Sequence, residues 1–265
     1  MNVGEAIAAS GIAAREARLL LAAASGLPAA SLLARPERDL APAALDTFLA
    51  FSARRARGEP VAYILGRQEF YGLELEVDPA VLIPRPETEL LVELALERLE
   101  AGEAAVLDLG TGSGAVALAV KRERPRARVV AVDASAAALA VAQRNAARHG
   151  LEVEFRQGHW FEPVAGERFD LVLANPPYVA EDDPHLAALG FEPREALVAG
   201  SDGLDAMREI LGDARGFLRP GGWIFVEHGA GQERAVRALL ARAGLRDGAT
   251  WPDLAGIARA SGARR

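Results

Sequence analysis

A glycine-rich loop and a later acidic residue are the first features of this chain that could do chemistry. The loop, Asp108-Leu109-Gly110-Thr111-Gly112-Ser113-Gly114, follows a run of apolar residues and precedes a predicted helix. Glycines let the backbone turn sharply and approach a ligand closely, and the N–H groups at a helix start favour anionic groups. Asp133 ends the next predicted strand, where a carboxylate accepts hydrogen bonds from ribose hydroxyls. Together they predict a site for a cofactor that contains adenosine.

The loop fits one nucleotide-binding pattern better than another. The dinucleotide pattern Gly-x-Gly-x-x-Gly needs a third glycine where this chain has Ala115, although variants with alanine exist. Gly-x-Gly-x-Gly with an acid two residues before it, as in the segment from Asp108 to Gly114, resembles the S-adenosylmethionine loop of Rossmann-like methyltransferases. A nucleotide-dependent oxidoreductase, a cofactor-binding scaffold without catalysis and a glycine turn without a ligand stay open as alternatives.

A second motif, Asn175-Pro176-Pro177-Tyr178, follows the apolar run 171–174 and so lies at the carboxyl end of a predicted strand. Each proline holds the residue before it in an extended conformation and has no N–H of its own. The Asn175 side-chain oxygen and the Pro176 carbonyl are therefore rigid acceptors, with the Tyr178 ring available as an apolar wall. Two acceptors held close together suit a planar NH2 group, as methylation of an amide or an exocyclic amine requires.

Beyond these motifs, the chain resembles a known family, the release factor glutamine methyltransferases. The most specific match is the segment 81–89, Val-Leu-Ile-Pro-Arg-Pro-Glu-Thr-Glu. The other matching residues are Tyr63, Ile64, Gly66, Phe70, Gly72, Gln143-Arg144-Asn145-Ala146, Asp183-Pro184-His185-Leu186, Phe191-Glu192-Pro193 and Asp253-Leu254-Ala255-Gly256. One departure is His159, where the family has Asp before Trp-Phe, and this leaves open how that position meets the adenine.

The resemblance implies methyl transfer from S-adenosyl-L-methionine to the side-chain nitrogen (N5) of the glutamine in the Gly-Gly-Gln motif of class-1 peptide chain release factors. The cofactor contacts that it implies come from Asp108, Gly110, Thr111, Gly112, Ser113, Gly114, Asp133, Trp160 and Asn175. The glutamine contacts that it implies come from Asn175, Pro176, Pro177 and Tyr178, of which Asn175, Pro176 and Tyr178 are the expected catalytic residues. A glutamine methyltransferase of a ribosomal protein and a nucleic-acid adenine-N6 methyltransferase remain alternatives.

Composition narrows these alternatives. The chain has 265 residues and no cysteine, which excludes disulfides, thiolate metal sites and a cysteine nucleophile. The net charge of −7 disfavours a protein that grips a nucleic-acid backbone. The four histidines show no metal-ligand spacing, and the longest apolar stretch, Leu19–Ala34, is too short and interrupted to span a membrane. We expect a cytoplasmic monomer that uses no metal and binds neither membranes nor nucleic acid directly.

The chain divides into three predicted parts. Residues 1–59 carry apolar residues at helical spacing and are expected to form a small helical domain that recognises a protein partner. Residues 60–84 are expected to form a β-hairpin connector, with Val61–Leu65 before the alternating strand Leu73–Val77. A helix over Pro86–Glu100 then opens the S-adenosylmethionine-dependent methyltransferase domain, residues 85–265.

Strands and helices alternate through this last domain. The predicted strands are Ala104–Leu109, Arg128–Asp133, Glu152–Phe155, Phe169–Ala174 and Trp223–Glu227. The predicted helices are Ala115–Arg122, Ala136–Arg148, Leu204–Leu218 and Gln232–Ala243. This order predicts an α/β fold with a mostly parallel twisted sheet and helices on both faces, and the resemblance identifies it as a Rossmann-like class I methyltransferase fold.

Three other residues have an open role. Arg85 and Glu87 could border the mouth of a substrate site, although an acid in the first turn of a helix already explains Glu87. Glu227, followed by His228 at a strand end, resembles an acid–base pair, but packing and hydrogen bonding at the strand end are the favoured explanation.

Overall fold

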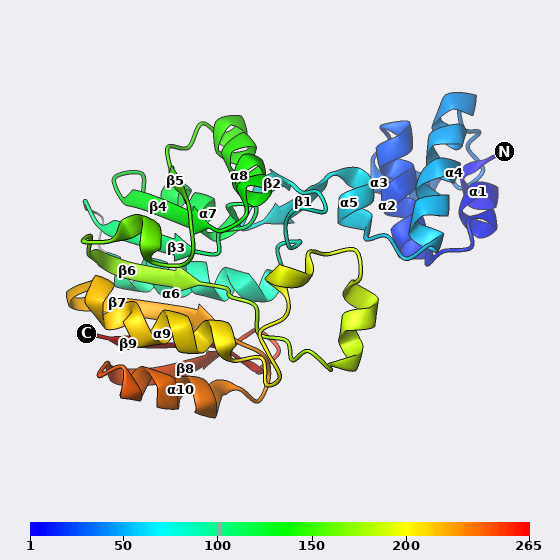
Figure 1. The fold of residues 1–265 in the computed structure, drawn as a ribbon. Helices are drawn as coiled ribbons and strands as arrows, with labels where there is room; N and C mark the ends of the chain where they lie inside the picture. Colours follow the sequence, from blue (N-terminus) through cyan, green and yellow to red (C-terminus); the bar gives the residue numbers. More distant parts are fainter. Residues whose placement is uncertain (100–101) are drawn as a thin grey trace. The chain divides into compact units, whose positions relative to one another are not determined.

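The computed structural model describes residues 1–99 and 102–265, which form two compact units, Met1–Arg67 and Gln68–Arg265 (Figure 1). The first unit is helical, as predicted. Its helices are α1 (Val3–Ala9), α2 (Ala14–Ser25), α3 (Ala29–Ala34), α4 (Pro42–Ala56) and α5 (Val61–Leu65). They share one apolar core, formed by Val3, Ala6, Ala17, Leu20, Leu21, Leu32, Phe48 and Ile64.

Local signals determine where the first helices begin and end. Asn2 and Glu5 form a capping box at the start of α1, with both hydrogen bonds at 2.9 Å. Gly26 ends α2 in the left-handed conformation, with φ at 68°. Arg55 of α4 forms an ion pair with Glu16 of α2 at 2.8 Å, which joins these two helices on the surface.

The expected strand over Val61–Leu65 is wrong, because these residues form the helix α5. Pro60 precedes its first turn, and Gly66 ends it with φ at 68°. Ile64 is 5% exposed and packs in the core of the helical unit. A short apolar run is compatible with a strand or a helix, so the flanking proline and glycine decide the outcome here.

The β-hairpin follows α5 and consists of β1 (Arg67–Phe70) and β2 (Leu73–Glu76). Tyr71 and Gly72 make its turn, both with positive φ, at 49° and 74°. Leu73 and Leu75 are buried while the glutamates between them are partly exposed, which is the alternation that the sequence predicted.

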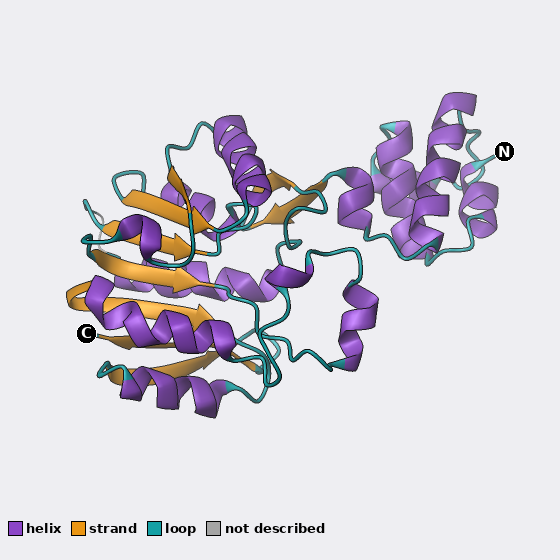
Figure 2. Cartoon of the chain, viewed as in Figure 1, coloured by secondary structure: helices purple, strands orange, loops and turns teal. Residues whose placement is uncertain are grey.

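The second unit is built on a seven-stranded sheet with the order β5-β4-β3-β6-β7-β9-β8 (Figure 2). Its strands are β3 (Ala105–Leu109), β4 (Arg128–Asp133), β5 (Glu154–Gln157), β6 (Phe169–Ala174), β7 (Leu218–Glu227), β8 (Arg246–Pro252) and β9 (Ala258–Arg264). The pairs from β5 to β7 are parallel, whereas β9 is antiparallel to both β7 and β8. The mostly parallel α/β sheet predicted from the sequence is confirmed.

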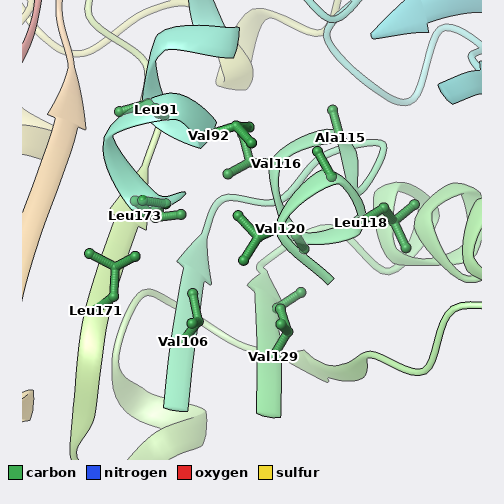
Figure 3. Close-up of a cluster of buried hydrophobic side chains, with 14 of the residues drawn as sticks. Leu91, Val92, Val106, Ala115, Val116, Leu118, Val120, Val129, Leu171 and Leu173 are labelled. Atoms are coloured by element: carbon green, nitrogen blue, oxygen red, sulfur yellow. The ribbon is translucent and has the colours of Figure 1, made fainter. Parts of the chain in front are cut away.

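Helices cover both faces of this sheet. They are α6 (Glu89–Arg98), α7 (Ala115–Glu123), α8 (Ala136–His149), α9 (Asp205–Phe217) and α10 (Glu233–Arg242). Val106 of β3 packs in a core with α6 and α7, whereas the next residue, Leu107, packs in a core with α9 and α10. Figure 3 shows the first of these cores, in which Val92 of α6 lies next to Val116 of α7. Burial on both faces explains why the central parallel strands β3, β4 and β6 are mostly apolar.

Several boundaries differ from the prediction. β5 begins at Glu154 instead of Glu152, and β7 begins at Leu218 instead of Trp223. The helix expected over Pro86–Glu100 is a 3-10 turn, η1 (Pro86–Thr88), followed by α6, and its expected last residue lies outside the described residues. The C-terminal strands β8 and β9 were not predicted.

Candidate active site

A cavity of about 310 Å³ lies at the carboxyl ends of β3, β4 and β6. Ligands of doubly wound sheets bind at this edge, beside the strand where the order reverses. The predicted site residues in its lining are Asp108, Gly110, Thr111, Gly112, Ser113, Asp133, Trp160, Asn175 and Pro177. Gly114, Pro176 and Tyr178 adjoin these residues in the chain but are not part of the lining. The fold thus brings the glycine loop and the Asn-Pro-Pro-Tyr segment to one place.

The glycine loop depends on backbone conformations that favour glycine. Gly110, Gly112 and Gly114 have φ values of 69°, 54° and 83°. The Gly110 N–H donates to the carbonyl of Val132 at 2.9 Å, and the Gly112 N–H donates to the Asp133 carboxylate at 2.8 Å. The loop after β3 is therefore held directly against the end of β4.

Carboxyl groups give the cavity an acidic character, and two of them, Asp108 and Asp133, have raised pKa values. Asp108 is 2% exposed, and its burial raises its pKa to about 6, although a hydrogen bond from the Thr111 hydroxyl at 2.6 Å opposes this rise. Burial also raises the pKa of Asp133, against hydrogen bonds from the N–H groups of Gly112 and Ser135. A ligand that brings positive charge or hydroxyl donors would stabilise both carboxylates.

Asn145 of α8 fixes the loop from behind. Its side chain is fully buried, and its Nδ2 donates at 3.0 Å to the carbonyls of both Ser113 and Glu76. Its Oδ1 accepts a hydrogen bond from the Glu76 N–H at 2.6 Å. One amide thus joins the glycine loop, α8 and the end of β2, which gives a structural reason for asparagine in the Gln-Arg-Asn-Ala segment.

Trp160 is held over the loop in an uncommon backbone conformation. Its φ is 42°, and its ring lies against Gly110, where an added β carbon would be 3.4 Å from the ring edge. The Trp160 indole N–H donates to Glu209 of α9 at 3.0 Å, and the His159 Nε2 lies 2.7 Å from the same carboxylate oxygen. His159 also lines the cavity. The sequence analysis did not find Glu209, because nothing in the local pattern of α9 indicates that it meets this loop.

The Asn-Pro-Pro-Tyr segment is held by residues from other elements. The Asn175 Nδ2 donates to the Thr88 hydroxyl at 3.1 Å, and the Tyr178 hydroxyl donates to Glu227 at 3.2 Å. Burial raises the pKa of Tyr178, so its phenol stays protonated. Among the described residues, none donates a hydrogen bond to the Pro176 carbonyl. The carbonyl therefore remains available as an acceptor.

The segment 81–89 contributes more to the site than the sequence analysis assigned to it. Arg85 and Thr88 line the cavity, and Arg85 forms an ion pair with Glu192, whose side chain is 3% exposed. The second carboxylate oxygen of Glu192 accepts a hydrogen bond from the Ile83 N–H at 3.0 Å. Glu87 is not part of the lining. In the sequence, the family resemblance drew attention to this segment, but it did not indicate these contacts.

Within residues 1–99 and 102–265, no group of His, Asp and Glu side chains could hold a metal ion. Over the same residues, no helix has the length and apolar character needed to cross a bilayer.

Comparison with known proteins places both units in established families. Residues 5–66 match the PrmC N-terminal domain, and residues 86–190 match the methyltransferase small domain. The release factor glutamine methyltransferase of Xylella fastidiosa is 51% identical over 243 residues, which cover 90% of this chain and 88% of the relative. The enzyme of the same name from Burkholderia pseudomallei is 49% identical over 273 residues, which cover 99% and 96%.

A solved structure supports the fold. The methyltransferase from Pyrococcus furiosus aligns with a TM-score of 0.56 at 19% identity, covering 80% of this chain and 95% of that one. This structural likeness shows a shared class I methyltransferase architecture, whereas the sequence identities above identify the family. The resemblance stated from the motifs is confirmed, and the chain belongs to the family of release factor glutamine methyltransferases.

Proposed function

We propose that this chain transfers a methyl group from S-adenosylmethionine to the side-chain amide nitrogen (N5) of the Gly-Gly-Gln glutamine of class-1 peptide chain release factors. The observation that carries the proposal is one cavity that joins the glycine loop and Asp133 to Asn175. A nucleotide site beside rigid amide acceptors suits methylation of a planar nitrogen. The relatives that share about half of the sequence are named for glutamine and release factors.

The residues of the cavity fit this cofactor. We assign the Asp133 carboxylate to the ribose hydroxyls and the Trp160 ring to the adenine, with the N–H groups of the glycine loop beside them. Asp108 provides an acidic group for the cationic part, because its burial already raises its pKa to about 6 and a nearby positive charge stabilises its ionised form. S-adenosylmethionine supplies a sulfonium methyl group that is already activated for transfer.

The task of the protein is then to hold and activate the acceptor nitrogen. An amide lone pair is delocalised into its carbonyl, so a glutamine NH2 group is a poor nucleophile. We assign one of its hydrogens to the Asn175 Oδ1 and the other to the Pro176 carbonyl. These acceptors fix the position of the nitrogen and stabilise the positive charge that develops on it. Pro177 keeps the pair rigid, and Tyr178 anchors the segment through Glu227.

The helical unit, residues 1–67, has a separate role in this proposal. The cofactor and amide sites lie within the second unit, so we assign recognition of the release factor to the helices. We further propose that the protein acts as a cytoplasmic monomer without direct contact with nucleic acid. The net charge of −7 and the absence of cysteine support this assignment.

The test measures incorporation of a labelled methyl group into a purified class-1 release factor. Intact ribosomes and duplex DNA serve as parallel substrates, and a release factor with alanine in place of the Gly-Gly-Gln glutamine is the matched control. We expect labelling of the unaltered release factor only. Labelling of ribosomal protein or of adenine in its place would replace the proposal by one of the two alternatives.

A further inference from the structure

The Asn-Pro-Pro-Tyr segment is hydrogen-bonded to two residues that do not touch the substrate in the mechanism above. Thr88 lies at the end of η1, and its hydroxyl accepts a hydrogen bond from the Asn175 Nδ2 at 3.1 Å. Glu227 lies at the end of β7 and accepts a hydrogen bond from the Tyr178 hydroxyl at 3.2 Å. Thr88 and Glu227 are 4% and 2% exposed, so water cannot readily take the place of either.

The carboxyl group of Glu227 is only partly satisfied. Its Oε1 accepts the bond from Tyr178, but its Oε2 is buried and has no hydrogen-bond partner among the described residues. The Thr88 hydroxyl interacts with this carboxyl group and opposes the rise that burial causes in its pKa. A buried oxygen without a hydrogen-bond partner destabilises the folded protein. A hydroxyl group can rotate to donate its hydrogen to such an oxygen, and Thr88 carries such a group.

The direction of the Thr88 hydroxyl decides which way the Asn175 amide faces. A hydroxyl has one hydrogen to donate and two lone pairs to accept. If Thr88 donates its hydrogen to Glu227, it can only accept from Asn175, so it binds the NH2 group of the amide. The Asn175 Oδ1 is then left for the substrate. With the amide turned over, an NH2 group would face the NH2 group of the substrate, which cannot accept a hydrogen bond.

We propose that Thr88 and Glu227 are positioning residues: the Thr88 hydroxyl turns its hydrogen toward Glu227, and this fixes the Asn175 amide with its oxygen toward the acceptor nitrogen. This inference rests on the proposed function for the identity of that nitrogen. It assigns a role to the threonine of the Pro-Arg-Pro-Glu-Thr-Glu segment, which the cofactor and substrate contacts above leave without one.

Thr88 can donate its hydrogen to Glu227, and accept from Asn175, only when the Glu227 carboxyl group is ionised. Burial raises the pKa of Glu227 to about 7, and Glu87 adds to this rise, whereas Thr88, Tyr178 and Arg259 oppose it. The neighbouring His228 donates to the Gly229 carbonyl through Nδ1 and stays neutral, because burial lowers its pKa. A protonated Glu227 donates to Thr88, which releases the Thr88 hydrogen toward Asn175 and favours the reversed amide. The methylation rate should therefore rise with pH through about 7.

Two substitutions at position 88 test the proposal. Thr88→Val keeps the shape but removes the hydroxyl, and Thr88→Ser keeps the hydroxyl. Under single-turnover conditions with a release factor, we expect Thr88→Val to lower the rate on the order of 10²-fold, as misplacement of a reacting group does. Thr88→Ser should restore the rate to within a few-fold of the unsubstituted protein. S-adenosylmethionine affinity, measured by calorimetry, should stay within about twofold in both variants.

The pH profile separates this role from a structural one. The rise through about 7 should persist in Thr88→Ser and disappear in Glu227→Gln and Thr88→Val. An unchanged rate in Thr88→Val, or an unchanged pH profile in Glu227→Gln, would overturn the proposal.

A measurement without substrate keeps this test independent of the proposed function. The side-chain 15N–1H signals of Asn175, assigned by their loss in Asn175→Asp, should shift with pH around 7 in the unsubstituted protein but not in Thr88→Val. A signal that does not respond to pH in the unsubstituted protein would contradict the coupling, whatever the substrate is.

Discussion

Asp108 allows a prediction about charge in the cavity that can be worked out in numbers. Its carboxyl group is buried, and its pKa is raised to about 6 by the loss of hydration. S-adenosylmethionine brings positive charge, which stabilises the ionised carboxylate and lowers its pKa. Binding should therefore select the ionised form and release a proton near pH 6.

The size of the effect follows from the fraction of Asp108 that is ionised. With a pKa of about 6, roughly nine-tenths of the cofactor-free protein is ionised at about pH 7, but only about one-tenth at about pH 5. The dissociation constant of S-adenosylmethionine should therefore rise roughly tenfold when the pH is lowered from about 7 to about 5. Asp108→Asn removes this titration, so its affinity should be weaker at about pH 7 and should change less with pH, since Asp133, whose pKa is also raised, still titrates.

The same residue should destabilise the cofactor-free protein. A carboxyl group whose folded pKa is raised contributes stability below its unfolded pKa, and this stability is lost as pH rises through the folded pKa. For Asp108 the window runs from 3.8 to about 6, and a shift of about two units corresponds to about 3 kcal/mol. Asp108→Asn should then unfold at a higher denaturant concentration than the unsubstituted protein at about pH 7, although it binds the cofactor less well.

Calorimetry in two buffers with different ionisation enthalpies measures the proton released on binding, and urea unfolding measures the stability. Asp133→Asn is the matched control, because it removes a neighbouring cavity carboxylate and should leave the Asp108 titration in place. The reasoning is refuted if Asp108→Asn binds the cofactor with the same pH dependence as the unsubstituted protein.

Three other changes test separate parts of the site. Asp133→Ala should weaken S-adenosylmethionine binding by about 1.5–3 kcal/mol, the loss of a charge-assisted hydrogen bond, and calorimetry with unchanged affinity would exclude its ribose role. Asn175→Ala should lower kcat roughly 10²–10³-fold while the cofactor affinity stays the same, because the Asn175 oxygen stabilises charge that develops on the acceptor nitrogen during transfer. Asn175→Asp should lower kcat less. A near-normal single-turnover rate for Asn175→Ala would remove Asn175 from the mechanism. A fragment of residues 68–265, checked for folding by circular dichroism, should bind the cofactor but methylate a release factor poorly, and full activity would show that the helices do not recognise the substrate.

The sequence was most informative where a strand is buried on both faces. The bounds of β4 and β6 agree with the prediction, because each contains four consecutive apolar residues, 129–132 or 171–174, that are followed directly by a polar residue, Asp133 or Asn175. It was least informative for β9, Ala258–Arg264, which contains small residues and arginines. That strand forms because β7 and β8 supply hydrogen bonds on both sides, and such partners cannot be read from its own sequence.

The site was predicted to a similar degree. Predicted site residues such as Gly112 and Asn175 could be picked out because each belongs to a short motif that directly follows an apolar run. Residues that act through contacts between distant segments could not be picked out in this way, and Glu209 and Glu192 are examples. The resemblance drew attention to the segment 81–89, but only the geometry shows that Thr88 meets Asn175.

The order of the strands explains why these distant segments must meet. β3 lies between β4 and β6, so the loops after these three strands share one edge of the sheet. The glycine loop and Asp133 then occupy one side of that edge, and the Asn-Pro-Pro-Tyr segment occupies the other. The segment before α6 reaches the same edge at Thr88, next to β7, which ends in Glu227 beside β6. We therefore expect the residue at position 88 to be constrained by Asn175 and Glu227, so serine should be tolerated there and valine should not.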